Sequence, residues 1–176
     1  MSSPKLGIQL IIFRDRPRQD LAGVLRDVAR AGYDGIEAGV QFCYHNHNWE
    51  FTRFEGQVAL HRLAELTDPQ TVKFCVDVFW VAVGGEEPAA FIRRYADRIP
   101  YFHIKDGRWE PGHPGKATRF TELGAGDVDL PSAISAALQV GPEWLVYEQD
   151  TSYERDPVES ATESLNYLRQ LVGPGD

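Results

Sequence analysis

The chain alternates short apolar runs with amphipathic segments, which is the pattern of strands followed by helices. Residues 6–12 (LGIQLII) form an apolar run of strand length, and a polar, proline-bearing loop follows them. Asp20 can then cap a helix, because apolar residues recur after it at helical spacing and Gly32 lies where a helix often ends. The run GIE at 35–37 predicts a second strand directly after this helix.

The same alternation continues to the end of the chain. Apolar runs predict strands at QFCYHNH (41–47), TVKFCVDVFWVAV (71–83), YFHIKD (101–106) and WLVYEQD (144–150). Helices are predicted over 58–66, from Glu87 and Pro88 to Pro100, from Asp129 to Gly141, and from Asp156 to Gly173. The Gly/Pro-rich segment 108–119 is too long for a simple connector and is a candidate active-site loop. Strands that alternate with helices favour a parallel sheet covered by helices, either a barrel or a doubly wound sheet.

Composition narrows the class of protein and its partners. With 176 residues, 43% apolar and 25% charged, and a mean hydropathy of −0.35, the chain is expected to form one soluble domain over 1–176. The net charge of −8 and the absence of a Lys/Arg run argue against a nucleic-acid partner. No apolar run is long enough to span a membrane, and no signal-peptide pattern is present. Cys43 and Cys75 are the only cysteines, so a reduced, cytoplasmic protein is predicted.

Polar side chains capable of metal binding or proton transfer end four of the predicted strands. They are His45 and His47, Asp77, His103 and Lys105, and Glu148 and Asp150. Residues two apart on a strand share a face, and the carboxyl ends of the strands of a parallel barrel meet at one rim. Any one of these residues could equally be an ordinary hydrogen-bonded rim residue, but the repetition on four strands favours a site. Imidazole and carboxylate together suit a divalent ion such as Mn, Zn or Co.

Several stretches resemble, in the same order, motifs of the sugar phosphate isomerase/epimerase family of xylose isomerase-like TIM barrels. The stretches are YHNHNWEF, VDVFWVAVGG, FHIKDG, ELGAGDVD and VYEQD. The resemblance covers nearly the whole chain and implies a TIM-barrel-like (β/α) fold with a divalent metal cation (Mn, Zn, Co or Mg) held by one group from each of four strands. Carried over, the ligands are Asp77, His103 and Glu148, and His45 lies where the family commonly has a glutamate. His47 then lies beside the metal or in contact with substrate.

The resemblance also implies a reaction, the isomerisation or epimerisation of a sugar or sugar phosphate. A metal-bound carbonyl acidifies the adjacent C–H bond, and a carboxylate moves the proton. Glu148 is the first choice for that carboxylate, with Glu50 or Glu37 as its partner, and Lys105 could stabilise a developing oxyanion or bind phosphate. Because His45 replaces a glutamate, isomerase, epimerase and lyase all remain open.

Further residues are expected to contact the substrate. They are His47, Trp49, Trp80, Glu37 and Lys105. Each has an ordinary structural alternative: a salt bridge for Lys105, solvation of the barrel mouth for Glu37, and core packing for the aromatic residues. Gly124 and Gly126 could expose backbone N–H groups to a phosphate, although they match a phosphate loop only loosely.

Two other functions are compatible with the same motifs. One is a catalytically inactive metal-binding or assembly protein of the same fold. The other, less favoured, is a metal-dependent phosphodiesterase acting on abasic DNA. That reaction would need further His and Glu ligands, and the acidic net charge argues against DNA.

The chain is short for this fold, since a TIM barrel takes about 250 residues. GIE passes almost directly into a run that resembles the family's fifth strand, so two strand–helix units are absent and about five strands are expected. Three intervening residues are too few for a crossover between parallel neighbours, and a tight hairpin would carry His45 away from the other ligands. One extended segment over 34–47 is therefore expected. Open sheet edges invite pairing, so we predict an intertwined, domain-swapped homodimer with 37–41 as its hinge.

Overall fold

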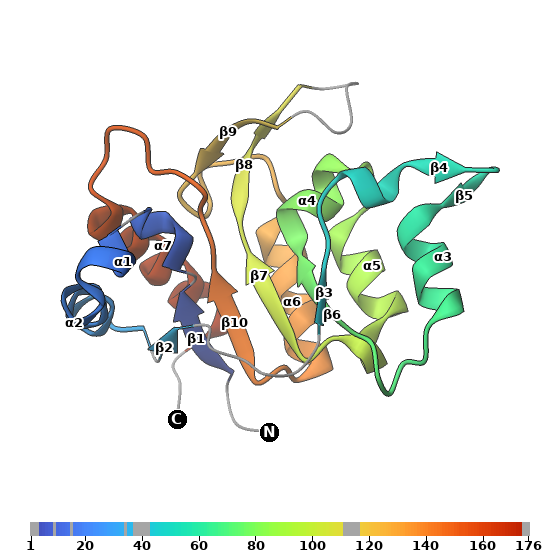
Figure 1. The fold of residues 1–176 in the computed structure, drawn as a ribbon, viewed down its shortest axis with the longest axis horizontal. Coiled ribbons are helices and arrows are strands. Elements are labelled where there is room, and N and C mark those ends of the chain that lie inside the picture. Colours follow the sequence, from blue (N-terminus) through green and yellow to red (C-terminus); the bar gives the residue numbers. More distant parts are fainter. Residues whose placement is uncertain are drawn as a thin grey trace.

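Six strands of the chain form one parallel sheet (Figure 1). The structure is a computed structural model that describes residues 4–8, 10–14, 16–33, 35–36, 43–110 and 117–173. The strand order is β2 (Gly35–Ile36), β1 (Lys5–Ile8), β10 (Trp144–Tyr147), β7 (Tyr101–Ile104), β6 (Lys73–Asp77) and β3 (Cys43–His45). Every neighbouring pair in this sheet is parallel, which confirms the predicted α/β class.

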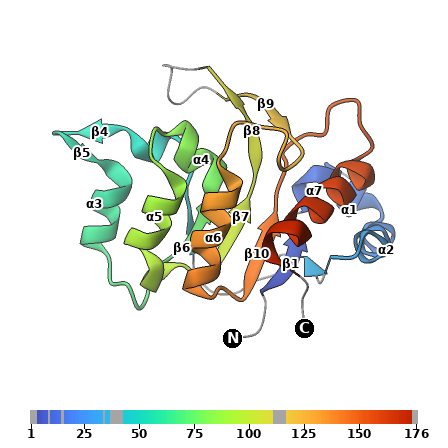
Figure 2. The same cartoon turned by 180° about the vertical axis from the view of Figure 1, so that it is seen from behind.

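Helices connect these strands and cover the sheet. They are α1 (Arg16–Gln19), α2 (Leu21–Ala31), α3 (Ala59–Leu66), α4 (Val78–Val83), α5 (Pro88–Arg94), α6 (Leu130–Val140) and α7 (Pro157–Val172), with 3-10 turns η1 (Leu10–Phe13), η2 (Trp49–Phe51) and η3 (Ala96–Arg98). Seen from behind, α5, α6 and α7 lie in front of the strands (Figure 2). Two antiparallel hairpins complete the elements: β4 (Arg53–Phe54) with β5 (Gln57–Val58), and β8 (Asp106–Trp109) with β9 (Ala117–Thr121). None of the described helices is long and apolar enough to cross a membrane.

Side-chain caps begin the main helices where the sequence predicts them. The capping carboxylates belong to Asp20, Glu87, Asp129 and Asp156, and each accepts a hydrogen bond from a backbone N–H of the first turn. Helix α2 ends at Gly32 with a φ of 89°, a left-handed conformation that glycine adopts with little strain. The predicted helix boundaries at these positions are confirmed.

The prediction of one long strand over 71–83 is wrong. Strand β6 ends at Asp77, and the following residues form α4. Asp77 causes the change, because its Oδ1 accepts a hydrogen bond from Trp80 N at 3.0 Å and so caps the helix. All six residues of α4 are apolar, and four of them are buried. No polar positions interrupt the run, so its sequence does not show the helical period.

The sheet is open, because β2 and β3 lie at its opposite edges. The sequence predicts one extended segment over 34–47. The described parts of this stretch instead form two separate strands, β2 and β3, at the two edges of the sheet. Residues 37–42 lie outside the described residues, and with them the predicted hinge at 37–41. Strand β1 pairs with β10 of the same chain. Each edge strand therefore has a strand neighbour on one side only within the described sheet, a situation that favours further pairing.

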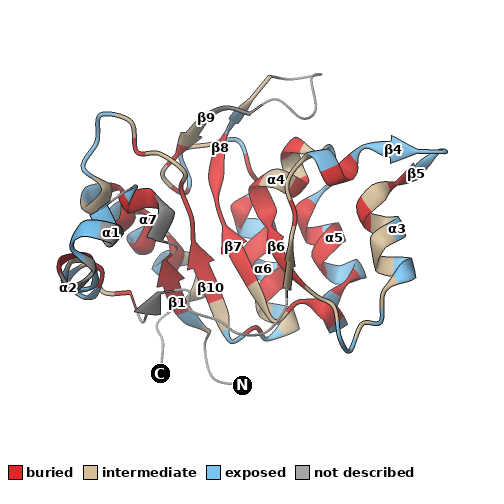
Figure 3. Ribbon diagram, viewed as in Figure 1, coloured by how far each residue is buried: buried red, intermediate tan, exposed pale blue. Residues whose placement is uncertain are grey.

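The inner strands of the sheet carry the core. Figure 3 shows β1, β10, β7 and β6 largely buried, while β3 is only half-buried. Phe102, Ile104, Leu145 and Tyr147 are fully buried and belong to one continuous apolar cluster that also includes residues of α5, α6 and α7. This core fixes the positions of the strands whose carboxyl ends carry the candidate ligands.

A buried carboxylate organises the turn that leads into α6. Asp106 is 1% exposed and accepts hydrogen bonds at 2.8 to 3.2 Å from the backbone N–H groups of Gly107, Gly124, Gly126 and Val128. The expectation that Gly124 and Gly126 offer these N–H groups to a phosphate is therefore wrong. The protein's own carboxylate already occupies the position that an anion would take.

Replacing Asp106 by alanine should strongly destabilise the protein, because the change leaves four backbone donors without their acceptor. We expect the free energy of unfolding to fall by at least about 3 kcal/mol in urea denaturation. Asp127→Ala is the matched control, since the Asp127 side chain is 42% exposed and should contribute less than about 0.5 kcal/mol. Similar losses in the two variants would contradict the role assigned to Asp106.

Candidate metal centre

Four neighbouring strands bring the predicted metal ligands to one edge of the sheet. Strands β3, β6, β7 and β10 are adjacent and parallel, so their carboxyl ends lie side by side. His45 ends β3 and Asp77 ends β6. His103 of β7 is in register with Asp77, and Glu148 directly follows β10.

The four side chains meet within a few ångströms. His45 Nε2 lies 3.5 Å from Asp77 Oδ2 and 3.9 Å from Glu148 Oε2. His103 Nδ1 lies 2.6 Å from Glu148 Oε2 and 3.1 Å from His45 Nε2. One donor atom from each of the four residues lies within 4.8 Å of all the others. Two imidazoles and two carboxylates thus surround one small volume.

Two carboxylate oxygens at this point have no hydrogen-bond partner among the described residues. They are Asp77 Oδ2 and Glu148 Oε2, whose residues are 0% and 5% exposed. His103 Nδ1 nevertheless approaches Glu148 Oε2 to 2.6 Å, and this contact lowers the pKa of Glu148. Leaving such buried acceptors unpaired costs free energy, which a bound cation would offset.

The donor set fits a divalent ion. Ligands bound at about 2.0–2.2 Å to one ion lie roughly 3–4 Å from each other, so the observed spacing needs only small shifts to close around an ion. Two nitrogens with two oxygens suit Zn, Mn or Co. The side chain of His45 is 26% exposed, so an ion has a route to the centre beside this ring.

The charges of the centre also favour a cation. Lys105 Nζ lies 2.8 Å from Asp150 Oδ1, 3.8 Å from Glu148 Oε1 and 3.9 Å from Asp77 Oδ2. Burial tends to lower the pKa of Lys105, but these three carboxylates raise it above its usual value, so the ammonium group stays charged. Burial tends to raise the pKa of Glu148, but the two imidazoles and Lys105 lower it to about 2. The three carboxylates of Asp77, Glu148 and Asp150 face the single ammonium group of Lys105, and a divalent cation bound among them would offset their negative charge.

Asn46 ties the edge strand to its neighbour at the centre. This residue is 2% exposed, its Nδ2 donates to Asp77 O at 3.2 Å, and its Oδ1 accepts from Asp77 N at 3.0 Å. The strand ladder between β3 and β6 ends at the pair His45 and Cys75, so the amide of Asn46 extends the pairing by two further hydrogen bonds. Asn46 therefore sets the position of His45 relative to Asp77.

Three of the predicted substrate-contacting residues lie beside the ligands. The ring of His47 stacks on Trp49 with centroids 4.2 Å apart, and lies 5.7 Å from Trp80 and 4.8 Å from His45. Trp49 is 59% exposed, and Trp80 is half-buried. Burial and the neighbouring His45 lower the pKa of His47, so its ring is neutral at pH 7. These rings form an aromatic wall at one side of the centre.

Lys105 lies in the centre but already has a partner. It is 1% exposed, and its ammonium group donates to Asp150 at 2.8 Å and lies near the faces of Trp80 and Phe120. The salt bridge foreseen as the structural alternative for this lysine is present. Contact between Lys105 and a substrate stays a prediction.

Glu50, the predicted partner of Glu148 in proton transfer, has both oxygens engaged. Its carboxylate accepts from Tyr44 Oη at 2.8 Å and from the backbone N–H of His47 at 3.0 Å. This arrangement favours a positional role for Glu50 in the turn that carries His47. Glu37, the other predicted partner, lies outside the described residues.

Asn46 and Asp150 also belong to the centre. The sequence places Asp150 among the strand-end side chains but assigns it no role, and it does not single out Asn46. Asp150 follows Glu148 by two residues, and this spacing already indicates a common face. Burial raises the pKa of Asp150 above its usual value, and Lys105 opposes that effect. The sequence HNH carries no signal for Asn46, because its role depends on the backbone of a strand about 30 residues away.

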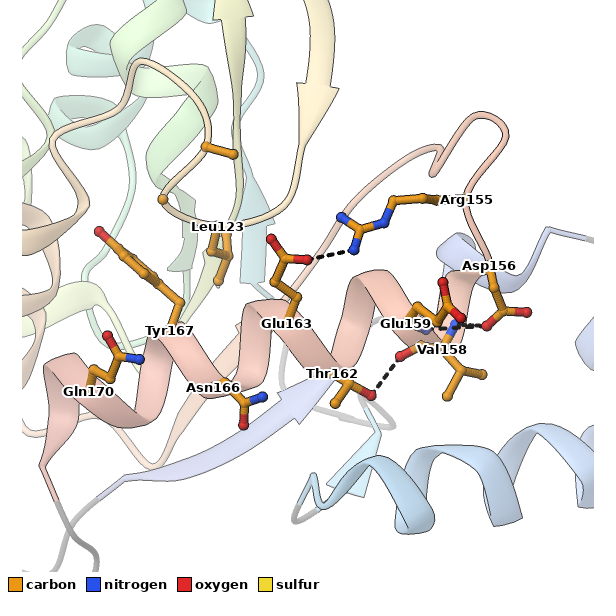
Figure 4. Close-up of a pocket in the computed structure, with 12 residues that line it drawn as sticks. Leu123, Arg155, Asp156, Val158, Glu159, Thr162, Glu163, Asn166, Tyr167 and Gln170 are labelled. Atoms are coloured by element: carbon orange, nitrogen blue, oxygen red, sulfur yellow. Dashed lines mark hydrogen bonds and ion pairs between the residues drawn. The ribbon is translucent and has the colours of Figure 1, made fainter.

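A separate groove of about 790 Å³ runs along α7 and contains none of the predicted ligands (Figure 4). Arg155 at one end of it pairs with Glu163 at 2.6 Å. Tyr167 lies toward the other end (Figure 4), and its ring packs against Gly124. The groove is open and is lined by both polar and apolar side chains, and we assign it no part in the candidate metal centre.

The parallel sheet and the four groups at its carboxyl edge define an incomplete (β/α) barrel with a candidate divalent-metal centre. Residues 12–171 match the family described as xylose isomerase-like TIM barrel, and the chain belongs to this family. The resemblance on which the predicted fold rests is thereby confirmed.

Among characterised relatives, the chain is similar to inosose dehydratases. It is 27% identical over 173 residues to the inosose dehydratase of Lacticaseibacillus casei, an alignment that covers 89% of this chain and 57% of the relative. It is 40% identical over 79 residues to that of Geobacillus kaustophilus (strain HTA426), covering 45% and 25%. The chain spans little more than half the length of the relatives that it matches along most of its own length.

Solved structures share the fold at low sequence identity. A sugar phosphate isomerase/epimerase from Parabacteroides distasonis ATCC 8503 superimposes with a TM-score of 0.75 at 15% identity, covering 96% of this chain and 94% of the other. An L-ribulose 3-epimerase superimposes with a TM-score of 0.63 at 13% identity, covering 96% and 94%. At such identities the likeness shows the fold alone.

Asn46→Ala should destabilise the protein, because the N–H and C=O of Asp77 lose their buried partner. We expect a loss of about 2–4 kcal/mol in the free energy of unfolding, measured in urea. Asn166→Ala makes the same chemical change on the exposed face of α7 and should cost less than about 0.5 kcal/mol. An Asn46 variant as stable as this control would show that the edge strand does not depend on the amide.

Proposed function

We propose that the protein is a metal-dependent sugar or sugar phosphate isomerase or epimerase that acts by proton transfer alpha to a carbonyl. The observation that carries the proposal is the convergence of His45, Asp77, His103 and Glu148, whose donor atoms lie within 4.8 Å of one another among the described residues. These four residues would hold the ion. When bound, a divalent ion there would polarise a substrate carbonyl and acidify the neighbouring C–H bond.

Glu148 is the group best placed to move the proton. It is ionised, it lies among the ligands, and its Oε1 faces Lys105 at 3.8 Å. Lys105 stays charged and would stabilise negative charge that develops on the substrate oxygen. Asp150 holds the lysine in place through the 2.8 Å ion pair. Glu50 is a weaker choice for a second acid–base group, because both its oxygens already accept hydrogen bonds.

The aromatic wall and the relatives support a polyhydroxylated ketone as substrate. Trp49 and Trp80 would pack against C–H groups of a sugar ring, and His47 between them would hydrogen-bond a hydroxyl group. Epimerisation and the elimination of water from a hydroxyketone both begin with loss of the proton alpha to the carbonyl. The similarity to inosose dehydratases therefore keeps a lyase reaction within the same proposal.

A catalytically inactive metal-binding or assembly protein is the second candidate. The open sheet favours it, since β2 and β3 have no barrel wall between them in the described part of the chain. A metal-dependent phosphodiesterase gains no support, because its further His and Glu ligands are not found at the centre among the described residues and the net charge of the chain is −8.

We also propose that a second copy of the chain completes the barrel as a homodimer. The edge strand β3 carries His45, so a strand added at this edge would also wall the centre. The same addition at β2 would cover the opposite edge. We propose that the copies exchange their first strand–helix unit, with further pairing between copies needed to cover these edges.

Proton exchange tests the reaction. In D2O with Mn2+, the protein should exchange the proton alpha to the carbonyl in at least one member of a panel of ketoses, inososes and sugar phosphates, followed by proton NMR. Glu148→Gln should slow this exchange by at least about 100-fold. Its bound metal is measured alongside, so that loss of the base is distinguished from loss of the ion.

Glu163→Gln is the control for this experiment, because the Glu163 side chain is 51% exposed on α7 and lies away from the centre. It should exchange at the rate of the unaltered protein. Exchange with no member of the panel by a metal-loaded protein would favour the inactive metal-binding protein instead.

Light scattering tests the assembly. At micromolar concentration the molar mass should be twice the 19.8 kDa of one chain, and it should persist on dilution. A folded species that stays at 19.8 kDa throughout the dilution series would rule out the homodimer.

A further inference from the structure

We propose that Cys75 gives the centre a second donor set, which takes a thiophilic divalent ion such as Cd2+ in place of the ion used in catalysis. This inference rests on the proposed function, because an ion bound through Cys75 can inhibit the protein only if the site is catalytic. According to this inference, the same site can bind a soft metal ion through Cys75, and this binding competes with binding through the carboxylates.

The position of Cys75 follows from the strand. It lies on β6 two residues before Asp77, so both side chains point to the same face of the sheet, with the thiol one layer deeper. Cys75 is also in register with His45 of β3 and is fully buried. Cys75 therefore lies nearer the amino end of β6 than Asp77 does, beside the strand that carries His45.

The geometry brings sulfur and imidazole together. The Cys75 sulfur, one ring nitrogen of His45 and one of His103 all lie within 4.8 Å of one another. An ion bound at about 2.1 Å to nitrogen and about 2.3 Å to sulfur places these atoms up to about 4.4 Å apart, so small shifts suffice. The ion would displace the thiol proton to solvent, because the thiolate is the form that binds metal.

The two donor sets share both histidines, so they are filled one at a time. The set with Asp77 and Glu148 offers oxygens, which Mn2+ and Mg2+ prefer, whereas the set with Cys75 offers a thiolate, which softer ions prefer. A thiophilic ion bound to Cys75 would also bind the two imidazoles that an ion held by Asp77 and Glu148 needs. Such an ion would therefore expel Mn2+ and switch the site off.

The test is a titration with Cd2+, followed by the sulfur-to-cadmium charge-transfer absorption in the ultraviolet, and by displacement of Mn2+ measured by electron paramagnetic resonance. The unaltered protein should develop one equivalent of the band. Cys75→Ala should lose the band but still bind Mn2+. Cys43→Ser is the matched control, because Cys43 is the only other cysteine and belongs to neither donor set in the described part of the chain, and it should keep the band.

Asp77→Ala separates this inference from the proposed function. It should lose Mn2+ and keep the cadmium–thiolate band, since the sulfur set does not include the carboxylate. No band in the unaltered protein, or a band that survives in Cys75→Ala, would overturn the inference and leave the Mn2+ site standing. Failure of the unaltered protein to bind Mn2+ would instead count against the proposed function, while the band would still decide the role of Cys75. Circular dichroism of Cys75→Ala and of a second variant, Cys75→Ser, checks that loss of the band does not reflect unfolding.

Discussion

Two buried carboxylates that face two imidazoles are the constraint on which this centre depends. Asp77 and Glu148 lie at the ends of strands in the core, where an unpaired negative charge is costly. Lys105 supplies one positive charge, but its shortest ion pair is the one with Asp150 at 2.8 Å. Three carboxylates thus face one ammonium group, and a divalent cation bound at the site would offset the remaining negative charge.

The second constraint is the open sheet. One of the four ligand strands, β3, is an edge strand of three residues, and its position depends on a short ladder to β6 and on the amide of Asn46. The strand that carries His45 is therefore the least supported part of the centre. This links assembly to chemistry, because a chain that pairs with β3 would hold His45 in place as well as close the barrel. It also bears on Cys75, which is in register with His45 on the neighbouring strand.

Much of this could be predicted from the sequence, and the failures have physical reasons. The caps at Asp20, Glu87, Asp129 and Asp156 and the strand-end ligands were readable, because each depends on local spacing or on the polarity that a rim requires. The helix after Asp77 could not be predicted, because α4 contains no polar positions that would show a helical period. The role of Asn46 and the use of the Gly124 and Gly126 N–H groups by Asp106 were not readable either, because both are contacts between residues distant in sequence. The sequence predicts about five strands, whereas the main sheet has six. The difference arises because the stretch 34–47, predicted as one extended segment, contains parts of two separate strands.

The central claim is that these four side chains bind one divalent ion, and crystals grown with Mn2+ test it most directly. Anomalous scattering should show a single strong peak per chain among His45, Asp77, His103 and Glu148, with one atom of each at about 2.0–2.4 Å from the ion. A well-ordered centre without a peak at saturating Mn2+, or a peak bound by other residues, would contradict the account.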